Sequence, residues 1–443
     1  MNEHTAPTKR ALVHYSLIAL PLSFAGLPLY IHMPDFYALQ FSLDVGALGV
    51  VLLIIRLIDA LQDPVIGYIA DRKSDKHAAL LYIGAAALTI GIAGLCFGPP
   101  HPSVTLLWFA LFMALATTGF SIISILVNMM GGLWKDNDKQ RARISSWREG
   151  IGLGGLLVAA LLPATLQSYI SAHTAFIIFF CVFAAFMTCA LPLFQAFMRN
   201  FSANKQRSKT SSVPSPFQIW SILFGENRSF FALTFLSFLS ASLPAVLVLF
   251  FIRDYLNAES FTGLFLSLYF ISGALFMGAW GMLARKHNLY RVWLYAMLLS
   301  IVTFCGALLV SSGDVWIYGA VCILSGIALG ADLALPPALI AGRITAQKKS
   351  ASASQHYAML ALLPKIAMAV AAGGAFMALD FVGFKAGQDN SDAALRALLI
   401  AYAAVPCVIK FLSAALLWRL IKKEGHINEH TERSTHHGTA HIS

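Results

Sequence analysis

The stretch LIIRLIDALQDPVIGYIADR, residues 53–72, carries three charged side chains within an otherwise apolar run. Arg56, Asp59 and Asp63 stand at i, i+3 and i+7, so a helix presents them on one face. Asp59 and Asp63 lie about 18 and 12 Å from the helix end near Asp71, at a rise of about 1.5 Å per residue. A charge inside the hydrocarbon costs roughly 2.5–3.5 kcal/mol, so this pattern predicts a membrane helix whose charged face lines a cavity.

The rest of the chain has the composition of a membrane protein. Of its 443 residues, 58% are hydrophobic and 12% are charged, and the mean hydropathy is +0.72. Soluble domains carry roughly 25% charged residues, so this composition excludes a soluble enzyme. The sequence contains no P-loop, nucleophile elbow or HExxH motif, and we expect no enzyme activity.

Apolar runs long enough to cross a bilayer follow one another along the chain, separated by short polar loops. They predict an all-α membrane protein with twelve transmembrane helices. The runs cover residues 12–32, 45–69, 78–98, 105–131, 147–167, 174–198, 230–252, 261–283, 292–311, 315–341, 355–381 and 395–420.

The longest polar interruption divides the runs six and six. It is rich in Ser and Lys, which is typical of a flexible linker. The expected organisation is an N-terminal half at 1–198, a cytoplasmic linker at 199–229, a C-terminal half at 230–421 and a disordered cytoplasmic tail at 422–443. The sequence GYIADRK after the second run recurs weakly as GMLARK after the eighth. Paired six-helix halves are the arrangement of major facilitator transporters.

Positive charge is distributed unequally between the loops. With the N-terminus in the cytoplasm, 24 of the 31 Lys and Arg residues lie on the cytoplasmic side and three on the opposite side. The positive-inside rule therefore places both termini in the cytoplasm, and we expect a multi-pass protein of the inner membrane. This distribution explains the net charge of +10, so nucleic-acid binding is not expected.

Neither a metal site nor a cofactor is expected. The six cysteines lie in apolar runs without a ligand or disulfide spacing, and we interpret them as core residues. The histidines of the tail have no rigid helix to organise them, so metal binding there is disfavoured.

Two further charges lie at similar depth on consecutive runs. Asp332 and Lys365 are about 13 and 16 Å from the cytoplasmic face by helix rise, which predicts an ion pair between them. This pair is either structural, or Lys365 exchanges between Asp332 and Asp63 during transport. Lys410, on the last run, is interpreted as structural because its long side chain can extend toward the membrane surface.

The fourth run contains a polar face. Ser121, Ser124 and Asn128 stand at i, i+3 and i+7. Hydroxyls in membrane helices often bond only to the backbone one turn earlier, so both a site and a purely local role stay open. Arg148, which opens the fifth run, is either interfacial or directed at the cavity.

Four motifs resemble the glycoside–pentoside–hexuronide:cation symporter family, the melibiose-permease branch of the major facilitator superfamily. They are RLIDALQDPVIGYIADR, KQRARISSWREG, GADLALPPALIAG and LLPKIAMAVAAGGAF. With the twelve-helix frame, the resemblance covers nearly the whole chain. It implies that Asp59 and Asp63 form the coupling-cation site, beside Arg56. It also implies that Arg148 is a sugar-site residue and that Lys365 lies between the two sites.

The sequence departs from this family on the fourth run. Ser124 stands where the family has an aspartate for sodium-coupled sugar recognition, and Asn128 stands where it has an aromatic residue. The family's helix-one aspartate has no counterpart in YSLIALPLSFAGLPLY. These departures bear on melibiose-type sugar specificity and not on cation coupling.

We therefore predict a monomeric secondary-active symporter that moves a small solute, a sugar or glycoside, with a coupling cation. The predicted cation-coupling residues are Asp59, Asp63, Ser121 and Ser124, and the predicted substrate-binding residues are Arg56, Asn128, Arg148, Asp332 and Lys365. The coupling ion is H⁺ or Na⁺, with H⁺ favoured because protonation needs only one carboxylate. Apart from solute, cation and membrane lipids, no partner is expected. A carrier of lysolipid or another amphipathic solute and a non-transporting sensor stay open as alternatives.

Overall fold

The structure is a computed structural model. It describes residues 7–41, 43, 45–73, 76–135, 137–167, 169–205, 222, 225–347, 349, 352–385 and 388–439. All regular secondary structure in these ranges is helical, which confirms the predicted all-α class. Most of the predicted linker at 199–229 lies outside the described residues.

The N-terminal half comprises α1 to α8. Their bounds are Lys9–Ser16 (α1), Ala19–Ala25 (α2), Leu27–Phe41 (α3), Val45–Arg72 (α4), His77–Phe97 (α5), Thr105–Leu133 (α6), Asp138–Gln167 (α7) and Ala172–Lys205 (α8). Gly98, which follows α5, has a φ of 78°, a conformation that glycine adopts without a steric penalty.

The C-terminal half comprises α10 to α16. Their bounds are Arg228–Phe250 (α10), Thr262–Lys286 (α11), Leu289–Ala307 (α12), Val315–Ala346 (α13), Ala353–Phe381 (α14), Asp392–Leu399 (α15) and Val405–Thr439 (α16). Two π-helical turns continue this half, Phe251–Tyr255 (η4) after α10 and Ile400–Ala404 (η7) between α15 and α16. Asn288 caps α12, its side chain accepting the Tyr290 N–H at 2.9 Å.

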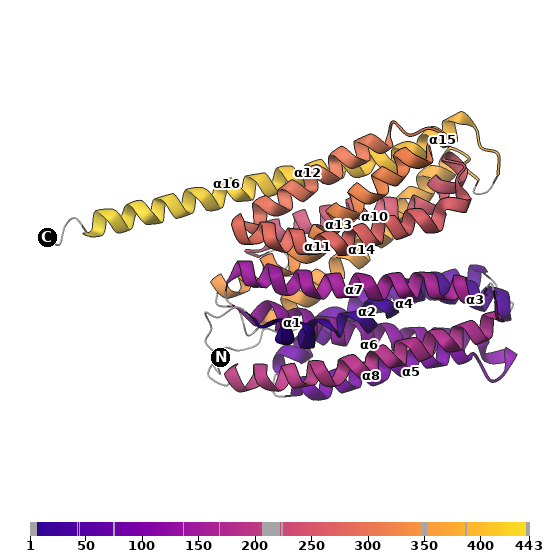
Figure 1. Cartoon of the computed structure of the whole chain (residues 1–443), viewed down its shortest axis with the longest axis horizontal. Coiled ribbons are helices and arrows are strands. Elements are labelled where there is room, and N and C mark those ends of the chain that lie inside the picture. Colours follow the sequence, from indigo (N-terminus) through magenta and orange to yellow (C-terminus); the bar gives the residue numbers. More distant parts are fainter. Residues whose placement is uncertain are drawn as a thin grey trace.

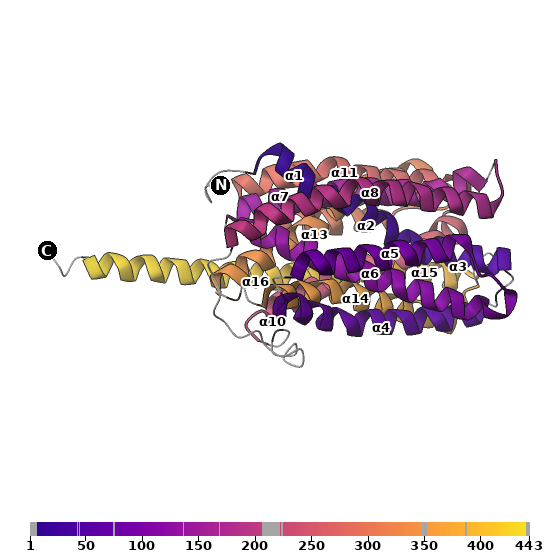
Figure 2. The same cartoon turned by 90° about the horizontal axis from the view of Figure 1, so that it is seen from below.

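The two halves form separate helix bundles that lie side by side (Figure 1). Helix α7 packs against α11 and α13, while α14 packs against α4 and α6. Figure 2 shows α4, α6 and α14 next to one another along one side of the molecule. Helix α1 begins at the same end of the molecule at which α16 leaves the bundle. We call this end the terminal end and the opposite end the far end.

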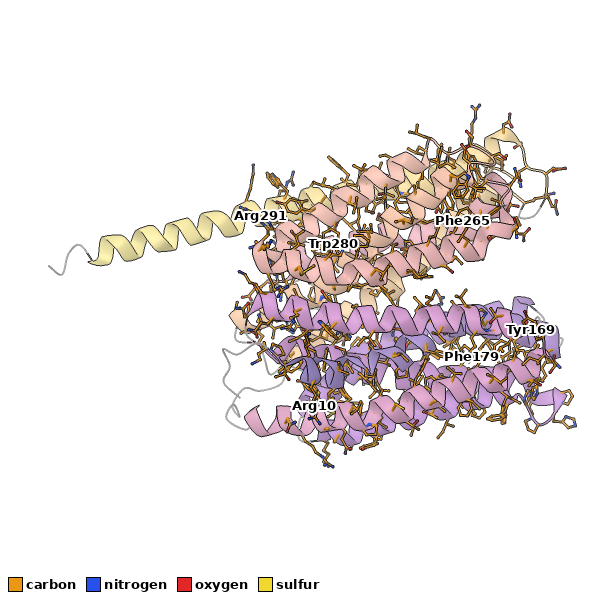
Figure 3. The ribbon with its side chains drawn as sticks, in the orientation of Figure 1. Arg10, Tyr169, Phe179, Phe265, Trp280 and Arg291 are labelled. Carbon is orange, nitrogen blue, oxygen red and sulfur yellow. The ribbon has the colours of Figure 1, made fainter. Side chains whose placement is uncertain are left out.

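Each bundle has its own aromatic core. In the N-terminal half Phe179 packs on Phe24, with 4.4 Å between ring centroids, and in the C-terminal half Phe265 packs on Tyr318 at 4.8 Å. Phe179 and Phe265 lie inside their bundles in Figure 3. Each half thus contains its own aromatic packing, while the largest buried apolar cluster continues across both halves.

Ten helices among the described residues are long and apolar enough to cross a membrane. They are α5, α6, α7, α8, α10, α11, α12, α13, α14 and the continuous α15–α16 segment. The remaining two predicted spans correspond to α1–α3 and to α4. The number twelve therefore stays a prediction, whereas a multi-pass helical membrane protein is confirmed.

The first predicted span, 12–32, differs from the structure because it is divided between α1, α2 and α3. Pro21 lacks the N–H that would bond to the Leu17 carbonyl, which instead accepts the Leu20 N–H at 3.1 Å. Gly26, with φ −76° and ψ −114°, ends α2. The apolar pattern predicted neither these breaks nor the continuation of α3 to Phe41.

Helix α16 extends past residue 422, where the predicted tail begins. Helix α16 continues as helix to Thr439 and projects beyond the bundle at the terminal end (Figure 1). A helix already formed in the bundle extends by one hydrogen bond per residue without a new nucleation step, which favours continuation into a polar segment.

Candidate cation and solute site

Helix α4 has one lipid-type face and one charged face. Ile54, Leu57 and Leu61 are at least half exposed, whereas Asp59 is 6% exposed and Asp63 is fully buried. This is the reverse of a soluble helix, and it follows from a hydrocarbon surrounding in which the outer surface is apolar. The charged face points toward α6 and α14, the helices packed against α4.

Lys365 on α14 holds the two aspartates together. Its Nζ lies 2.8 Å from Asp59 Oδ2 and 2.7 Å from Asp63 Oδ2. Because α4 belongs to the N-terminal half and α14 to the C-terminal half, this ion pair crosses between the halves. Asp63 Oδ1 is buried and has no hydrogen-bond partner among the described residues, so the pair keeps one free acceptor atom.

Polar side chains on α6 and α4 complete the coordination. Lys365 Nζ donates to Ser121 Oγ at 3.0 Å, and Ser121 donates to Asp59 Oδ1 at 3.0 Å. Gln62 Nε2 donates to the same Asp59 oxygen at 2.9 Å, while Gln62 Oε1 accepts from Thr118. Ser121 was predicted from the sequence as a cation-coupling residue. Gln62 was not, although it stands at i+3 from Asp59 on the same helix. Asp59, Asp63, Ser121, Gln62 and Lys365 together are called the carboxylate site below.

Arg56 lies one turn before Asp59 on α4 and is partly buried. The ammonium that contacts both carboxylates is that of Lys365, more than 300 residues further along the chain.

A second polar group, on α6 and α7, contains Arg148. The guanidinium of Arg148 is hydrogen-bonded to Asn128 on α6 and ion-paired with Glu149 on α7. Asn128 Nδ2 in turn donates to the Ser124 carbonyl at 2.8 Å. Ser124 therefore lies with the Arg148 group and not in the carboxylate site, so the polar face of α6 serves both groups with different residues. Arg148 is buried and lines a cavity, as the other interpretation from the sequence requires.

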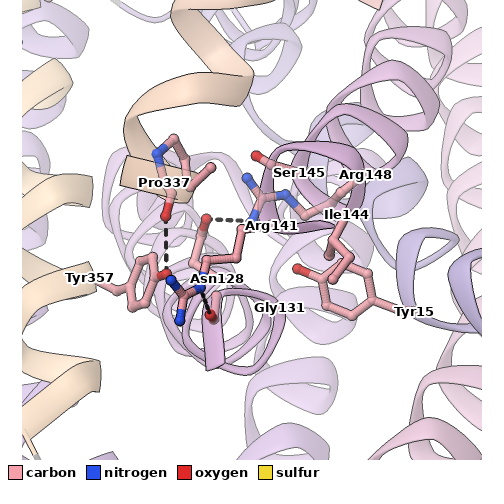
Figure 4. Close-up of a pocket in the computed structure, with 11 residues that line it drawn as sticks. Tyr15, Asn128, Gly131, Arg141, Ile144, Ser145, Arg148, Pro337 and Tyr357 are labelled. Atoms are coloured by element: carbon pink, nitrogen blue, oxygen red, sulfur yellow. Dashed lines mark hydrogen bonds between the residues drawn. The ribbon is translucent and has the colours of Figure 1, made fainter. Parts of the chain in front are cut away.

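A cavity lies beside Arg148, between the halves. Figure 4 shows that α1, α6 and α7 of one half and α13 and α14 of the other contribute side chains to it. Its lining comprises Tyr15, Asn128, Gly131, Gly132, Arg141, Ile144, Ser145, Arg148, Pro337, Ala338 and Tyr357. The hydroxyl of Ser145 is buried without a hydrogen-bond partner among the described residues. A cavity bordered by both halves is where an alternating-access carrier binds its solute.

Two tyrosines close this cavity over consecutive glycines of α6. A Cβ atom added at Gly131 would lie 1.9 Å from the Tyr15 hydroxyl, and one added at Gly132 would lie 1.6 Å from the Tyr357 hydroxyl. Tyr15 donates to the Val127 carbonyl at 2.9 Å and Tyr357 donates to the Pro337 carbonyl at 3.1 Å. Glycine at these positions is therefore required for the close approach of α1 and α14 to α6.

The structure corrects the expected pair between Asp332 and Lys365. Asp332 on α13 is ion-paired with Lys410 on α16 and accepts hydrogen bonds from Ser237 at 3.1 Å and Trp293 at 2.8 Å. This buried group lies within the C-terminal half, apart from the carboxylate site. The depths expected from helix rise are similar for the two charges. Asp332, however, faces α10, α12 and α16 of its own half, whereas Lys365 faces α4 and α6 of the other half. Lys410 does not extend to the surface; it is 2% exposed.

Further contacts join the halves at the terminal end. Arg141 on α7 donates to Thr345 on α13 at 2.7 Å and to the Gly132 carbonyl at 3.1 Å. A Cβ added at Gly67 on α4 would lie 2.8 Å from the Ala358 Cβ on α14. The halves are thus closely packed between the cavity and the terminal end.

Residues 14–422 match the sequence profile of a family described as MFS/sugar transport protein. Inner membrane symporter YicJ of Escherichia coli (strain K12) is 26% identical over 144 residues, 32% of this chain and 31% of YicJ. Uncharacterized symporter YnaJ of Bacillus subtilis (strain 168) is 32% identical over 143 residues, 31% of this chain and 30% of YnaJ. Putative glycoside/cation symporter YagG of E. coli (strain K12) is 27% identical over 139 residues, 30% of each chain. The matched stretch spans about a third of each relative's length.

Solved structures show the same fold. A bacterial homologue of the iron transporter ferroportin in the outward-facing state has a TM-score of 0.66 at 17% identity, over 92% of this chain and 98% of that chain. The human organic anion transporter MFSD10 has a TM-score of 0.61 at 14% identity, over 93% and 100% of the two chains. At such identities the likeness concerns the fold alone.

Proposed function

Because this chain belongs to the MFS/sugar transport protein family, we propose that it is a symporter that moves a sugar or glycoside across the membrane together with a cation. The resemblance to glycoside–pentoside–hexuronide:cation symporters is confirmed by the family match and by the three symporters to which the chain is similar. The observation that carries the proposal is the Lys365 ammonium held between Asp59 and Asp63.

This ion pair can connect cation binding to movement of the halves. Lys365 lies on α14 and both aspartates lie on α4, so each ion pair stabilises the packing of the two halves. A cation that binds Asp59 or Asp63 lowers the attraction for Lys365 and weakens that packing. Cation occupancy therefore changes the relative stability of the two states, which is the condition for coupling.

H⁺ is the coupling ion that this geometry favours. Lys365 already has three side-chain oxygens within 3.0 Å, the environment that a metal cation would need for itself. Na⁺ would have to displace the ammonium, whereas a proton needs a single carboxylate oxygen. The unpartnered Asp63 Oδ1 provides one.

The solute is assigned to the cavity beside Arg148. The Arg148 guanidinium, the Asn128 amide and the Ser145 hydroxyl provide hydrogen-bonding groups that suit the hydroxyls of a sugar. Glu149 balances the charge of Arg148, so this surrounding favours a neutral glycoside over a charged solute. Asp332, assigned to the substrate by sequence, is not among the residues that line this cavity and is ion-paired with Lys410.

We assign the terminal end to the cytoplasm, in agreement with the positive-inside rule. The packed contacts around Arg141 and Gly67 then close the cytoplasmic side in this state. A cysteine introduced at Ser208 should react with reagents only from the cytoplasm. Labelling of that cysteine from outside would show that the terminal end is not cytoplasmic, and it would not affect the coupling proposal.

The coupling proposal is tested by uptake into vesicles that contain the purified chain. A panel of radiolabelled methyl glycosides is offered with an inward pH gradient, an inward Na⁺ gradient or no gradient. We expect accumulation with the pH gradient, and its loss in Asp59→Asn, Asp63→Asn and Lys365→Ala. Lys385→Gln, which changes a loop lysine at the far end, is the matched control and should accumulate normally.

The outcomes separate the parts of the proposal. Accumulation that persists in both aspartate variants contradicts the coupling site. Dependence on Na⁺ instead of pH contradicts the assignment of H⁺. Gradient-driven uptake of a labelled lysolipid, with no uptake of glycosides, contradicts the solute class alone.

A further inference from the structure

Two cysteines in the C-terminal half lie in contact with each other. Cys305 in the last turn of α12 donates to Cys407 on α16, with 3.8 Å between the two Sγ atoms. Cys407 donates in turn to the Ile301 carbonyl at 3.6 Å. The two residues are far apart in sequence, so only the packing of α12 against α16 brings the thiols together.

The position of these thiols also differs from the sequence interpretation of all six cysteines as core residues. Cys96 and Cys322 are buried, but Cys305 is exposed and Cys407 is partly exposed. The lipid-facing side of a membrane helix is as apolar as its packed side, so an apolar run does not show which face a cysteine occupies. The thiol pair therefore lies where a small molecule dissolved in the bilayer can reach it.

The distance allows a covalent bond with little movement. A disulfide joins its sulfurs at about 2.05 Å, so the two Sγ atoms, 3.8 Å apart, must approach by about 1.8 Å. Both thiols are free in this structure. Neither residue contributes to the carboxylate site or to the cavity beside Arg148.

We propose that Cys305 and Cys407 form a redox-sensitive dithiol that a neutral azo or quinone oxidant converts into an intrachain disulfide. Both S–H bonds break and one S–S bond forms. The two electrons and two protons pass to the oxidant, which becomes the corresponding hydrazine or hydroquinone. Because α12 and α16 belong to the same half, the bond ties two helices of the C-terminal half together and leaves the contact between the halves unchanged.

The experiment counts free thiols in the full chain. Protein in lipid vesicles is treated with diamide, a membrane-permeant azo oxidant, then denatured and labelled with a maleimide polymer that retards the protein once per free thiol. The untreated chain should carry six labels and the oxidised chain four. Reduction by dithiothreitol should restore six, which distinguishes a disulfide from irreversible oxidation.

Single variants identify the pair. Cys305→Ser and Cys407→Ser should each carry five labels before and after diamide. Cys181→Ser, which removes an exposed cysteine of the other half, is the matched control and should change from five labels to three. The proposal is contradicted if the native chain keeps six labels, if Cys305→Ser still loses two, or if the lost thiols appear as a disulfide-linked dimer.

Discussion

Asp71 at the end of α4 accepts the backbone N–H of Ser354 at the start of α14, with 2.8 Å from the Ser354 nitrogen to Asp71 Oδ1. Its second oxygen, Oδ2, accepts the Gln355 N–H at 2.9 Å. A carboxylate of the N-terminal half thus caps a helix of the C-terminal half. The hydrogen bonds and the helix dipole favour a negative charge at this position, whereas burial of the carboxyl opposes it.

Loss of this cap should weaken closure of the terminal end. Asp71→Ala removes two hydrogen bonds to a charged group, each worth about 1.5–3 kcal/mol, so the population open at this end should rise by about a hundredfold or more. The rise is measured as faster maleimide labelling of a cysteine placed at Ser145 in the cavity. Asp314→Asn is the matched control, because Asp314 accepts the Ser311 N–H within one loop of the C-terminal half. Equal labelling in Asp71→Ala and the native background would show that this cap does not hold the halves.

Ser121 and Ser124 should behave differently, although both were predicted for the cation site. Ser121→Ala removes the hydroxyl that bonds to Asp59 and Lys365, which loosens Lys365 and lets a cation compete more easily. The cation concentration for half-maximal uptake should fall by about tenfold, from the loss of about 1.5 kcal/mol or more. Ser124→Ala should leave that concentration unchanged. A similar fall in both variants would place Ser124 in the cation site after all.

The Asp332–Lys410 pair should be structural. Asp332→Asn leaves Lys410 buried without its counter-charge and should destabilise the protein by about 3–5 kcal/mol, seen as a lower thermal midpoint in detergent. Asp332→Leu combined with Lys410→Met should recover most of the stability, because it removes both charges and retains the volume. The exposed pair of Lys349 and Glu226 is the control, and Glu226→Gln should have little effect.

Transport by the double variant decides the role of Asp332. Gradient-driven uptake near the native level would remove Asp332 from the predicted substrate-binding residues. A well-folded double variant without uptake would instead support Asp332 as a substrate-binding residue.

Gly132 should tolerate no side chain while Tyr357 is present. Gly132→Ala places a methyl group against the Tyr357 hydroxyl and should separate α14 from α6. The free energy of unfolding should fall by about 1–3 kcal/mol from overpacking, and uptake should be lost. Tyr357→Phe should partly restore Gly132→Ala, because it removes the clashing oxygen. Gly154→Ala on α7 is the control, since a Cβ there has nothing within 4 Å. A tolerated Gly132→Ala would contradict the close packing of the cavity wall.

Much of the carboxylate site was predictable from one helix. The spacing of Asp59 and Asp63 fixes their common face through the helical period, and their position within an apolar run fixes their depth. Ser121 was accessible in the same way, as part of a polar face on a run that is otherwise apolar. Gln62 carried the same helical signal, one turn from Asp59, and was not predicted.

The sequence by itself determined the all-α class and which residues of a helix share a face, because these depend only on local hydrophobicity and a fixed helical repeat. The tertiary structure alone decided which lysine meets which aspartate. Depth is one coordinate, whereas an ion pair also needs the rotation and the neighbours of each helix. Lys365 is therefore paired with Asp59 and Asp63 on α4, and Asp332 with Lys410, because helix packing between and within the halves sets the rotation and the neighbours of each helix.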